Sequence, residues 1–552
     1  MSQKQGLCSY FKDNIIRRWN EDAFTDYGGA TLRCHDVARK IEKLHIMYEN
    51  CGIRPGDKIA LCGRNSSHWG VAFFSILTYG AVAVPILHEF KSEQIHNIIN
   101  HSGSLLLFLS DNMLKSVDLK EIPGVQGIIQ FSDFSLIESR SEQLTYAREH
   151  LNELYGKKYP KYFRPEHVHY HHDKPEELAV INYTSGTTGY SKGVMIPYRA
   201  ITGNLEFCIR VIGPKLAKGS HMLNMLPLAH MYGLLVELIF AFCNGCHVYF
   251  LTRVPSPSTL AQAFKDVRPA IIIAVPLIIE KMVRTKVFPK IQTNVMRLLL
   301  NMPVVSRKVK HKIYEQVMEA FGGKIYEVIV GGAPFNQEVE SFLRSIGFPI
   351  SVGYGVTECA PLISFSDYMD NLPGSCGQPV DGMEVKIVRA NPDDESGEIL
   401  ARGQNVMLGY YKDEEATAQA IDSEGWYHTG DLGTMIPDGH IFIRGRLKSM
   451  LLASNGQNVY PEEIEDKLGG MPLVADCLVV QRGEKFVALV YPDAEAMKSM
   501  SFNDNDVKKV MDQNMKHLNH VLPAYSRVSA IELREEPFEK TPKKSIKRFL
   551  YS

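Results

Sequence analysis

The first part of the chain alternates short apolar runs with longer amphipathic segments. Five runs have the length of buried strands: Lys58–Cys62, Val82–Ile86, Leu105–Leu109, Ala270–Ala274 and Tyr326–Val330. Intervening segments such as Ser92–Ser102 and Val309–Phe321 carry apolar residues three or four positions apart, as a helix with one buried face does. This alternation predicts an α/β fold, with a large N-terminal domain of helix-covered parallel sheets.

The pattern changes near Cys376. Short β-prone pieces are now separated by clusters of Gly, Pro and Asp, and three of these pieces are Glu384–Val388, Gly397–Ala401 and His440–Ile443. Such spacing is typical of antiparallel strands joined by turns. We therefore expect a small β-rich subdomain over about residues 376–443.

A separate α+β segment begins after Arg446. Pro461 marks a helix start, and Lys485–Tyr491 is a β-prone run. The length of 552 residues also requires more than one domain, because single hydrophobic cores stop growing beyond about 300 residues. We expect an N-terminal domain over residues 1–446 and a small C-terminal domain over residues 447–552.

Composition and charge narrow the class of protein. Hydrophobic residues make up 45% of the chain and charged residues 22%, which are ordinary globular values. The net charge of −1 gives no electrostatic reason to expect nucleic acid as a partner. Met1–Gly6 does not lead into a secretory signal, and the longest apolar runs are shorter than the ~20 residues of a spanning helix. These features predict a soluble, cytoplasmic protein.

Two groups of potential metal ligands have simpler explanations. Cys243 and Cys246 have C-x-x-C spacing, but one pair cannot complete a four-ligand zinc site. We expect a turn that joins two strands and carries two buried, reduced thiols. Four histidines lie in polar sequence between Pro165 and Pro175, which indicates a surface loop; they are His167, His169, His171 and His172.

The segment Tyr183–Gly193 has the composition of a phosphate-binding loop. Strand-forming residues precede it, and its glycines and hydroxyl side chains offer N–H and O–H donors to an anion. Lys192 adds a positive charge. The segment is not a Walker A loop, because Ser191 stands where that pattern requires its second glycine. A polyphosphate is therefore the expected ligand.

Six further motifs follow this loop, and together they resemble the adenylate-forming superfamily of acyl-CoA synthetases, luciferases and peptide-synthetase adenylation domains. In chain order they are Leu226–Gly233, Val330–Pro334, Val352–Glu358, Trp426–Gly433, Ile443–Lys448 and Asn455–Ile464. The segment Ala274–Lys281, with Leu226–Tyr232, looks most like long-chain fatty acyl-CoA synthetases. The resemblance covers most of the chain and implies a mobile C-terminal domain.

The resemblance assigns a role to residues of each motif. ATP phosphates are expected on the loop residues Thr184, Ser185, Gly186, Thr187, Thr188, Gly189 and Lys192. The remaining nucleotide contacts implied are Gly332, Ala333 and Tyr354 at the adenine, Gly353 and Gly355 in the motif of Tyr354, Thr357 at the α-phosphate, Asp431 at the ribose, and Arg446. Glu358 is the implied Mg²⁺ ligand, His230 lies beside the acyl group, Gly456 approaches the coenzyme A thiol, and Lys448 is the hinge. Catalytic roles are implied for Thr184, His230 and Glu358.

The family has a catalytic lysine near its C-terminus, and the corresponding segment of this chain departs from the family pattern. The family usually ends with T-x-x-G-K-x-x-R, and aligning Thr541 and Arg548 with it puts Ser545 at the lysine position. Our hypothesis is that Lys544 is the catalytic lysine, with Lys543 or Lys547 as alternatives. A solvated basic tail is the non-catalytic interpretation.

The reaction implied by the resemblance has two steps, with ATP, Mg²⁺, a fatty acid and coenzyme A as participants. The acid first forms an acyl-adenylate and releases pyrophosphate, and the coenzyme A thiol then expels AMP. An aryl or medium-chain acid, a carrier protein acting in trans as acceptor, and a non-catalytic nucleotide binder are the alternatives. An amino acid is disfavoured, because His221–Leu226 contains no acidic partner for its ammonium group. A lipid substrate makes peripheral membrane contact reasonable.

Overall fold

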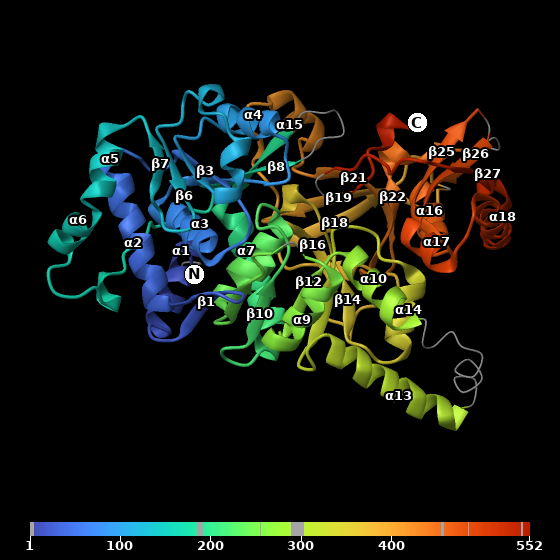
Figure 1. The fold of residues 1–552 in the computed structure, drawn as a ribbon. Coiled ribbons are helices and arrows are strands. Elements are labelled where there is room, and N and C mark those ends of the chain that lie inside the picture. Colours follow the sequence, from blue (N-terminus) through green and yellow to red (C-terminus); the bar gives the residue numbers. More distant parts are fainter. Residues whose placement is uncertain are drawn as a thin grey trace.

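The computed structural model describes residues 5–184, 191–253, 255–288, 303–392, 394–453, 457–483, 485–541 and 545–551. Two large sheets form the body of the chain (Figure 1). The first has the order β20-β9-β8-β4-β3-β5-β6-β7. Its strands are β3 (Lys58–Cys62), β4 (Val82–Ile86), β5 (Leu106–Leu109), β6 (Gly127–Gln130), β7 (Leu136–Ser139), β8 (Leu178–Thr184), β9 (Lys192–Pro197) and β20 (Gly409–Tyr410).

The second large sheet has the order β14-β13-β12-β10-β11-β1-β2. Its strands are β1 (Asp22–Asp26), β2 (Thr31–Arg33), β10 (His221–Asn224), β11 (His247–Phe250), β12 (Ile271–Ala274), β13 (Glu327–Val330) and β14 (Ile350–Val352). All neighbours in this sheet are parallel except β1 and β2. Apolar residues fill both faces of its central strands, as expected for a sheet with layers on either side.

Helices cover and separate the two sheets. They include α1 (Leu7–Arg17), α2 (Cys34–Asn50), α3 (Ser67–Tyr79), α4 (Ser92–Ser102), α5 (Glu142–Glu149), α6 (Leu151–Lys158), α7 (Tyr198–Val211), α9 (Pro257–Val267), α10 (Pro276–Lys286), α13 (Pro303–Ala320) and α14 (Gln337–Ser345). Helix α3 is buried nearly all round and contacts β3 and β4 of one sheet and β1 of the other. The main hydrophobic core therefore lies between the sheets, and the predicted α/β class is confirmed.

The C-terminal third is richer in antiparallel strands. Four of them form the sheet β18-β19-β21-β22: β18 (Met383–Val388), β19 (Gly397–Gly403), β21 (Tyr427–Met435) and β22 (Ile441–Arg446). A small sheet of β15 (Tyr354–Gly355), β16 (Leu362–Phe365) and β17 (Gln378–Pro379) lies before it in the chain, and α15 (Glu414–Ala420) follows β20. The antiparallel pairing agrees with the Gly- and Pro-punctuated pattern of this region.

The last hundred residues form a compact α+β unit with its own apolar core. Its elements are β23 (Leu451–Leu452), β24 (Asn458–Val459), α16 (Pro461–Gly469), β25 (Val474–Arg482), β26 (Lys485–Pro492), α17 (Ala494–Met500), α18 (Asp504–Val521) and β27 (Val528–Leu533). Polar contacts join it to the larger body: Asn336 donates to the backbone oxygen of Asp466 at 3.1 Å, and the hydroxyls of Ser396 and Tyr460 are 2.5 Å apart. The exact domain boundary stays a prediction.

One local prediction was wrong. Cys243 and Cys246 join a helix to a strand, because a π-helix, η5 (Gly233–Phe240), and the short α8 (Ala241–Cys243) precede β11. The run before the turn is buried on all sides, so its sequence has no periodicity that separates helix from strand. Both thiols are free and buried, as expected. Among the four histidines, His171 is half-buried and its ring bonds Glu177 at 2.7 Å.

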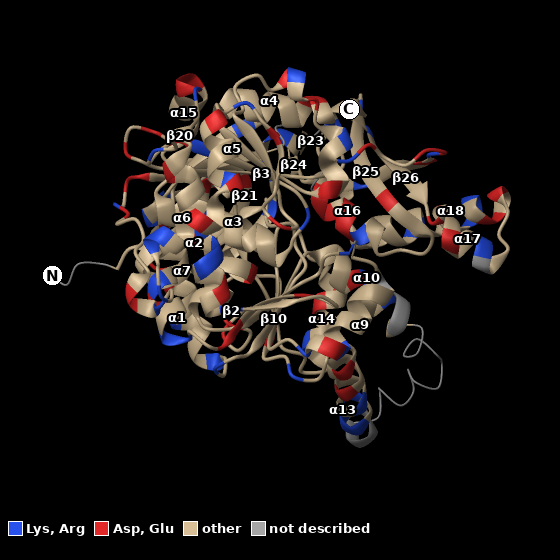
Figure 2. Ribbon diagram, turned by 60° about the vertical axis from the view of Figure 1, so that its left-hand side comes forward, with Lys and Arg blue, Asp and Glu red and all other residues tan. Residues whose placement is uncertain are grey.

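Charges of both signs are interspersed over the helices, and α13 projects from the body (Figure 2). Among helices of the described ranges, none combines the length and apolar character needed to span a membrane.

Candidate nucleotide and acyl site

Two of the predicted motifs, those of Gly331 and Gly353, lie where parallel strands of the second sheet end. The backbone N–H of Gly331 donates to Ala274 at the end of β12 (3.1 Å), and that of Gly353 donates to Val330 at the end of β13 (2.9 Å). These bonds hold the two glycine turns beside each other. The carboxyl ends of parallel strands are the usual place for a ligand in α/β sheets.

Asp431 joins three parts of the predicted nucleotide site. The Tyr354 hydroxyl donates to its Oδ2 at 2.7 Å, and the Arg446 guanidinium lies 2.9 Å from its Oδ1. Asp431 and Arg446 are partners in the β21–β22 ladder, so the strand register brings them together. Burial raises the pKa of Asp431, and the charge of Arg446 opposes that rise.

Glu358 lies close enough to Asp431 for its charge to contribute to the raised pKa of that residue. One of its oxygens accepts a hydrogen bond from the Tyr410 hydroxyl at 3.0 Å, and the Lys192 ammonium lies 4.7 Å from the centre of the Tyr410 ring. Tyr410 thus contacts both Glu358, the predicted metal ligand, and Lys192, which is predicted to bind a phosphate. Sequence reasoning missed it, because β20 pairs with β9 across about two hundred residues and no local pattern signals that pairing.

The predicted phosphate loop connects β8 to β9 in the sequence. Thr184 and Lys192 face each other in the last pair of this antiparallel ladder, so the loop begins and ends at adjacent residues. The loop residues Ser185, Gly186, Thr187, Thr188 and Gly189 lie outside the described residues, as do Gly456, Lys543 and Lys544.

The other predicted residues take the following places. Gly332 has φ +84°, a conformation that favours glycine. A Cβ at Gly355 would lie 2.1 Å from the Pro361 carbonyl oxygen, so this position also requires glycine. Thr357 begins the short helical turn that carries Glu358, Ala333 is exposed beside Gly332, His230 is half-buried, and Lys448 is exposed in the turn Leu447–Ser449.

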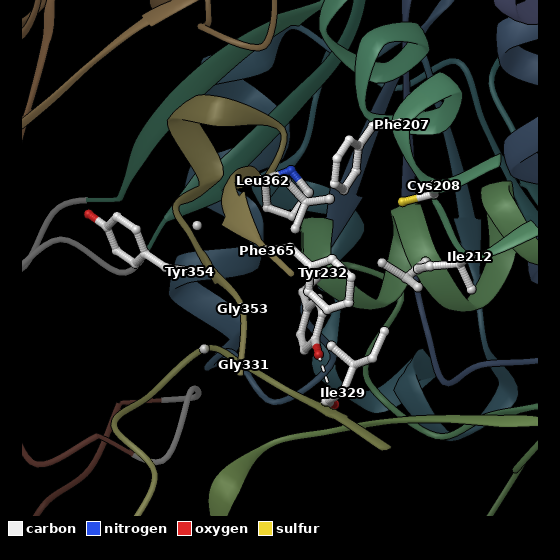
Figure 3. Close-up of a pocket in the computed structure, with 14 residues that line it drawn as sticks. Phe207, Cys208, Ile212, Tyr232, Ile329, Gly331, Gly353, Tyr354, Leu362 and Phe365 are labelled. Atoms are coloured by element: carbon white, nitrogen blue, oxygen red, sulfur yellow. Dashed lines mark hydrogen bonds between the residues drawn. The ribbon is translucent and has the colours of Figure 1, made fainter. Parts of the chain in front are cut away.

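A cavity of about 60 Å³ opens between the glycine turns and helix α7 (Figure 3). Gly331, Gly353 and Tyr354 line one end, and Phe207 and Cys208 of α7 line the other. Figure 3 shows Tyr354 projecting to the side opposite the α7 residues. The sequence predicted the glycine end, whereas amphipathic α7 gave no signal for which of its buried residues face a cavity.

Tyr232 forms a wall of this cavity. Its hydroxyl donates to the backbone oxygen of Ile329 at 3.1 Å. An added Cβ at Gly331 would lie 3.2 Å from the Tyr232 ring, so the glycine permits this close packing. The wall around Tyr232 is apolar, with Ile212, Val236 and Phe365 nearby in the lining.

Hydrogen bonds join residues that flank the predicted lysine in the C-terminal segment. Thr541 N–H donates to Ser545 at 2.8 Å, and the Lys547 ammonium bonds Glu539 at 2.6 Å. The pKa of Glu539 is lowered mainly by Lys547, and the charge of Lys91, in the large domain, lowers it further. Glu539 therefore lies near Lys91, which directly precedes α4. Lys547 is already paired with Glu539, and the backbone oxygen of Ser545 is paired with the N–H of Thr541.

Comparisons with known proteins identify the family to which the chain is similar. The family described as "AMP-binding enzyme" matches residues 11–411, and "AMP-binding enzyme C-terminal domain" matches residues 448–551. A long-chain-fatty-acid–CoA ligase of Mycobacterium bovis is 26% identical over 97% of this chain and 92% of its own length. A peroxisomal long chain acyl-CoA synthetase of Arabidopsis thaliana is 28% identical over 88% of this chain and 74% of its own.

Solved structures share the fold. An anthranilate CoA ligase in complex with anthranoyl-AMP superposes with a TM-score of 0.79 at 21% identity, covering 100% of this chain and 97% of its own. ATP-bound MatB from Rhodopseudomonas palustris gives 0.76 at 19% identity, covering 99% of this chain and 97% of its own.

Proposed function

The chain belongs to the AMP-binding enzyme family, and we propose that it activates a fatty acid with ATP and transfers the acyl group to coenzyme A. The observation that carries this proposal is the convergence of Asp431, Tyr354 and Arg446 close to Glu358. This cluster offers carboxylate acceptors for ribose hydroxyls and an arginine for a phosphate. Relatives that match nearly the whole chain are long-chain-fatty-acid–CoA ligases, which supports the choice of acid and acceptor.

The first half-reaction is the formation of the acyl-adenylate. A carboxylate oxygen of the acid attacks the α-phosphorus of ATP, the bond to the bridging oxygen of pyrophosphate breaks, and acyl-AMP forms. Two anions meet in this step, so the protein must supply positive charge and hydrogen-bond donors at fixed positions. Lys192 and Arg446 carry such charge, and Lys544 is the lysine that we propose at the reacting carboxylate.

Glu358 suits the magnesium ion that accompanies ATP. Tyr410 holds one carboxylate oxygen, and none of the described side chains donates to the other. Mg²⁺ is usually bound by one or two protein carboxylates together with substrate phosphates, and this site offers that kind of ligand. When bound, the ion would offset negative charge on the phosphates.

The second half-reaction requires access for a thiol. The sulfur of coenzyme A attacks the acyl carbonyl carbon, and the bond from that carbon to the AMP oxygen breaks. We assign the hinge for this step to Lys448, which is exposed in the turn between the two domains. The contacts Asn336–Asp466 and Ser396–Tyr460 join the domains in the present arrangement and would break on rotation.

The cavity supports an apolar acyl group. Its α7 end is lined by apolar side chains, and within the described ranges no acidic residue lines it to receive an α-ammonium group. Its volume of about 60 Å³ is well below the ~300–1,000 Å³ of typical ligand pockets, so a long chain requires its walls to move. Tyr232 is the wall that we propose moves, because among the described residues a single hydrogen bond, to the backbone oxygen of Ile329, fixes its hydroxyl.

A short or aromatic acid is the second candidate substrate. The same small cavity favours it, because such an acid needs less movement of Tyr232. Comparing kcat/KM for acids from acetate to palmitate, with benzoate, at saturating Mg·ATP and coenzyme A distinguishes the two. An optimum at long chains supports the fatty-acid proposal, whereas an optimum at benzoate or at acids of a few carbons would assign the enzyme to the alternative.

A further inference from the structure

A buried glutamate outside all predicted motifs contacts the segment that carries His230. Glu237 lies on the π-helix η5, and its side chain is 0% exposed. Its Oε2 accepts hydrogen bonds from the backbone N–H groups of Met225 (3.1 Å) and Leu226 (2.9 Å). These two N–H groups lie just beyond β10, where no strand partner is available to them.

Asn65 holds the next part of the same segment. Its Nδ2 donates to the backbone oxygen of Leu226 at 2.6 Å, and its Oδ1 accepts from the backbone N–H of Leu228 at 3.1 Å. Its Nδ2 also lies 2.7 Å from Oδ1 of Asn224, whose own Nδ2 donates to Glu237 at 3.1 Å. Asn65 and Glu237 therefore belong to one connected network.

Asn182 completes the arrangement at the end nearest His230. It lies on β8 and donates to the backbone oxygen of Ala229 at 2.8 Å. Asn65 follows β3 and Asn182 belongs to β8, so two side chains from the first large sheet hold a segment that leaves the second. Side chains thus bond backbone groups at four residues of this segment: Met225, Leu226, Leu228 and Ala229.

The geometry of the π-helix η5 suits the contact between Glu237 and residues 225–230. The wide turns of a π-helix are frequent at functional sites, and η5 begins at Gly233, the last residue of the His230 motif. A Cβ at Gly233 would lie 3.0 Å from the Pro227 backbone oxygen, so the glycine lets the segment pack on the helix. Val236, adjacent to Glu237, lines the cavity together with Tyr232.

We propose that Glu237 is a positioning residue, which with Asn65 fixes residues 225–230 so that His230 is held at the acyl end of the site. The expected effect on catalysis rests on the proposed function. The expected effect on the position of residues 225–230 rests on the hydrogen bonds alone. Burial also raises the pKa of Glu237 well above its ordinary value, in keeping with a side chain that accepts bonds without an ionic partner. Buried N–H groups left without an acceptor are costly, so removing the carboxyl should release the segment.

The test compares Glu237→Leu with Glu327→Leu. Glu327 is an equally buried glutamate at the start of β13 and also accepts one backbone N–H bond, at 2.8 Å from Tyr368. We expect Glu237→Leu to lower kcat/KM for the acid by about 100-fold while KM for ATP changes less than about twofold. Glu237→Gln, which keeps an acceptor oxygen, should restore most of the activity. A Glu327→Leu variant with the same kinetic profile would overturn the proposal.

A double-mutant cycle tests whether Glu237 acts through His230. In a His230→Ala background, Glu237→Leu should cause little further loss, because the residue that it positions is absent. Fully additive losses would contradict the proposal. If Glu237→Leu does not fold, Asn65→Ala replaces it in the same cycle, with the same expected direction.

Amide hydrogen exchange tests the inference without activity. Glu237→Leu should lose protection over residues 225–230, and Glu327→Leu should not. Unchanged protection in this segment would overturn the positioning role even if the wild-type chain activated no acid. Failure of the proposed function and failure of this inference are thereby distinguishable.

Discussion

The guanidinium of Arg446 and the carboxylate of Asp431 lie 2.9 Å apart on paired residues of the neighbouring strands β21 and β22. Tyr354 bonds the other carboxylate oxygen, so both oxygens that we propose for the ribose hydroxyls already have protein partners. ATP must share these bonds or replace one of them. Arg446 is the partner that can leave, because its side chain is largely exposed whereas Tyr354 is buried.

This relationship predicts the effect of Asp431→Asn. The variant loses the charge that holds Arg446 and one acceptor for the ribose, so KM for ATP should rise by about tenfold or more. The matched control is Glu384→Gln, which breaks a comparable pair with Arg402 on the adjacent strand of the same sheet. Steady-state kinetics at varied Mg·ATP checks this, and equal KM values in the two variants would contradict the nucleotide assignment.

Tyr232 should set the acyl chain length. Tyr232→Ala removes the ring that packs against Gly331, enlarging the cavity, so the ratio of kcat/KM for palmitate to that for hexanoate should rise by about tenfold. Tyr232→Phe keeps the ring and loses only the bond to Ile329, and it should leave this ratio nearly unchanged. A ratio that stays constant in Tyr232→Ala would show that another wall limits the chain.

The C-terminal lysines should differ in their effect on adenylation. We expect Lys544→Ala to abolish acid-dependent pyrophosphate release. Lys547→Ala removes a side chain already paired with Glu539 and should cost only a few-fold, since an exposed ion pair contributes about 1 kcal/mol or less. Full pyrophosphate release by Lys544→Ala would exclude Lys544 as the catalytic lysine. Loss of pyrophosphate release only in Lys543→Ala would assign the role to Lys543.

Lys448→Pro should separate the two half-reactions. Proline restricts φ at the hinge and hinders rotation of the C-terminal domain. Adenylation should proceed at a near wild-type rate in the present domain arrangement, while acyl-CoA formation slows markedly. Single-turnover assays of each half-reaction measure this. Equal loss of both would mean that the variant misfolds or that the hinge lies elsewhere.

The helices and strands with a clear hydrophobic periodicity could be predicted from the sequence. Lys58–Cys62, Val82–Ile86 and Ser92–Ser102 have in the structure the bounds that their patterns gave. The Cys243–Cys246 turn was misassigned because the apolar run before it is buried on every side. The spacing of apolar and polar residues indicates which face of an element is buried, and it gives no information where no face is exposed.

Some residues of the candidate site could likewise be predicted from the sequence, and others could not. Asp431, Tyr354 and Arg446 could be predicted, since each lies in a recognisable sequence motif. The bond between Tyr410 and Glu358 depends on a strand pairing between distant segments, and the network around Glu237 depends on side chains from two sheets. Such tertiary contacts leave no signal in a single sequence.

Stability should depend on pH through Glu327. Burial raises its pKa to about 8, so the folded chain binds a proton that the unfolded chain releases near pH 4.5. The contribution of this group is fully present below pH 4.5 and is lost as pH rises to about 8, at about 1.4 kcal/mol per pH unit. Glu327→Gln should therefore show a smaller fall in Tm between pH 5 and pH 8 than the wild type. Parallel Tm curves would contradict the raised pKa.

The central claim is tested most directly by identifying products from palmitate and Mg·ATP by mass spectrometry, before and after coenzyme A is added. We predict palmitoyl-AMP and pyrophosphate without coenzyme A, and conversion to palmitoyl-CoA and AMP once it is present. ATP that binds but yields neither acyl-AMP nor pyrophosphate with any acid from acetate to palmitate, or with benzoate, would contradict the account and indicate a nucleotide-binding protein without ligase activity.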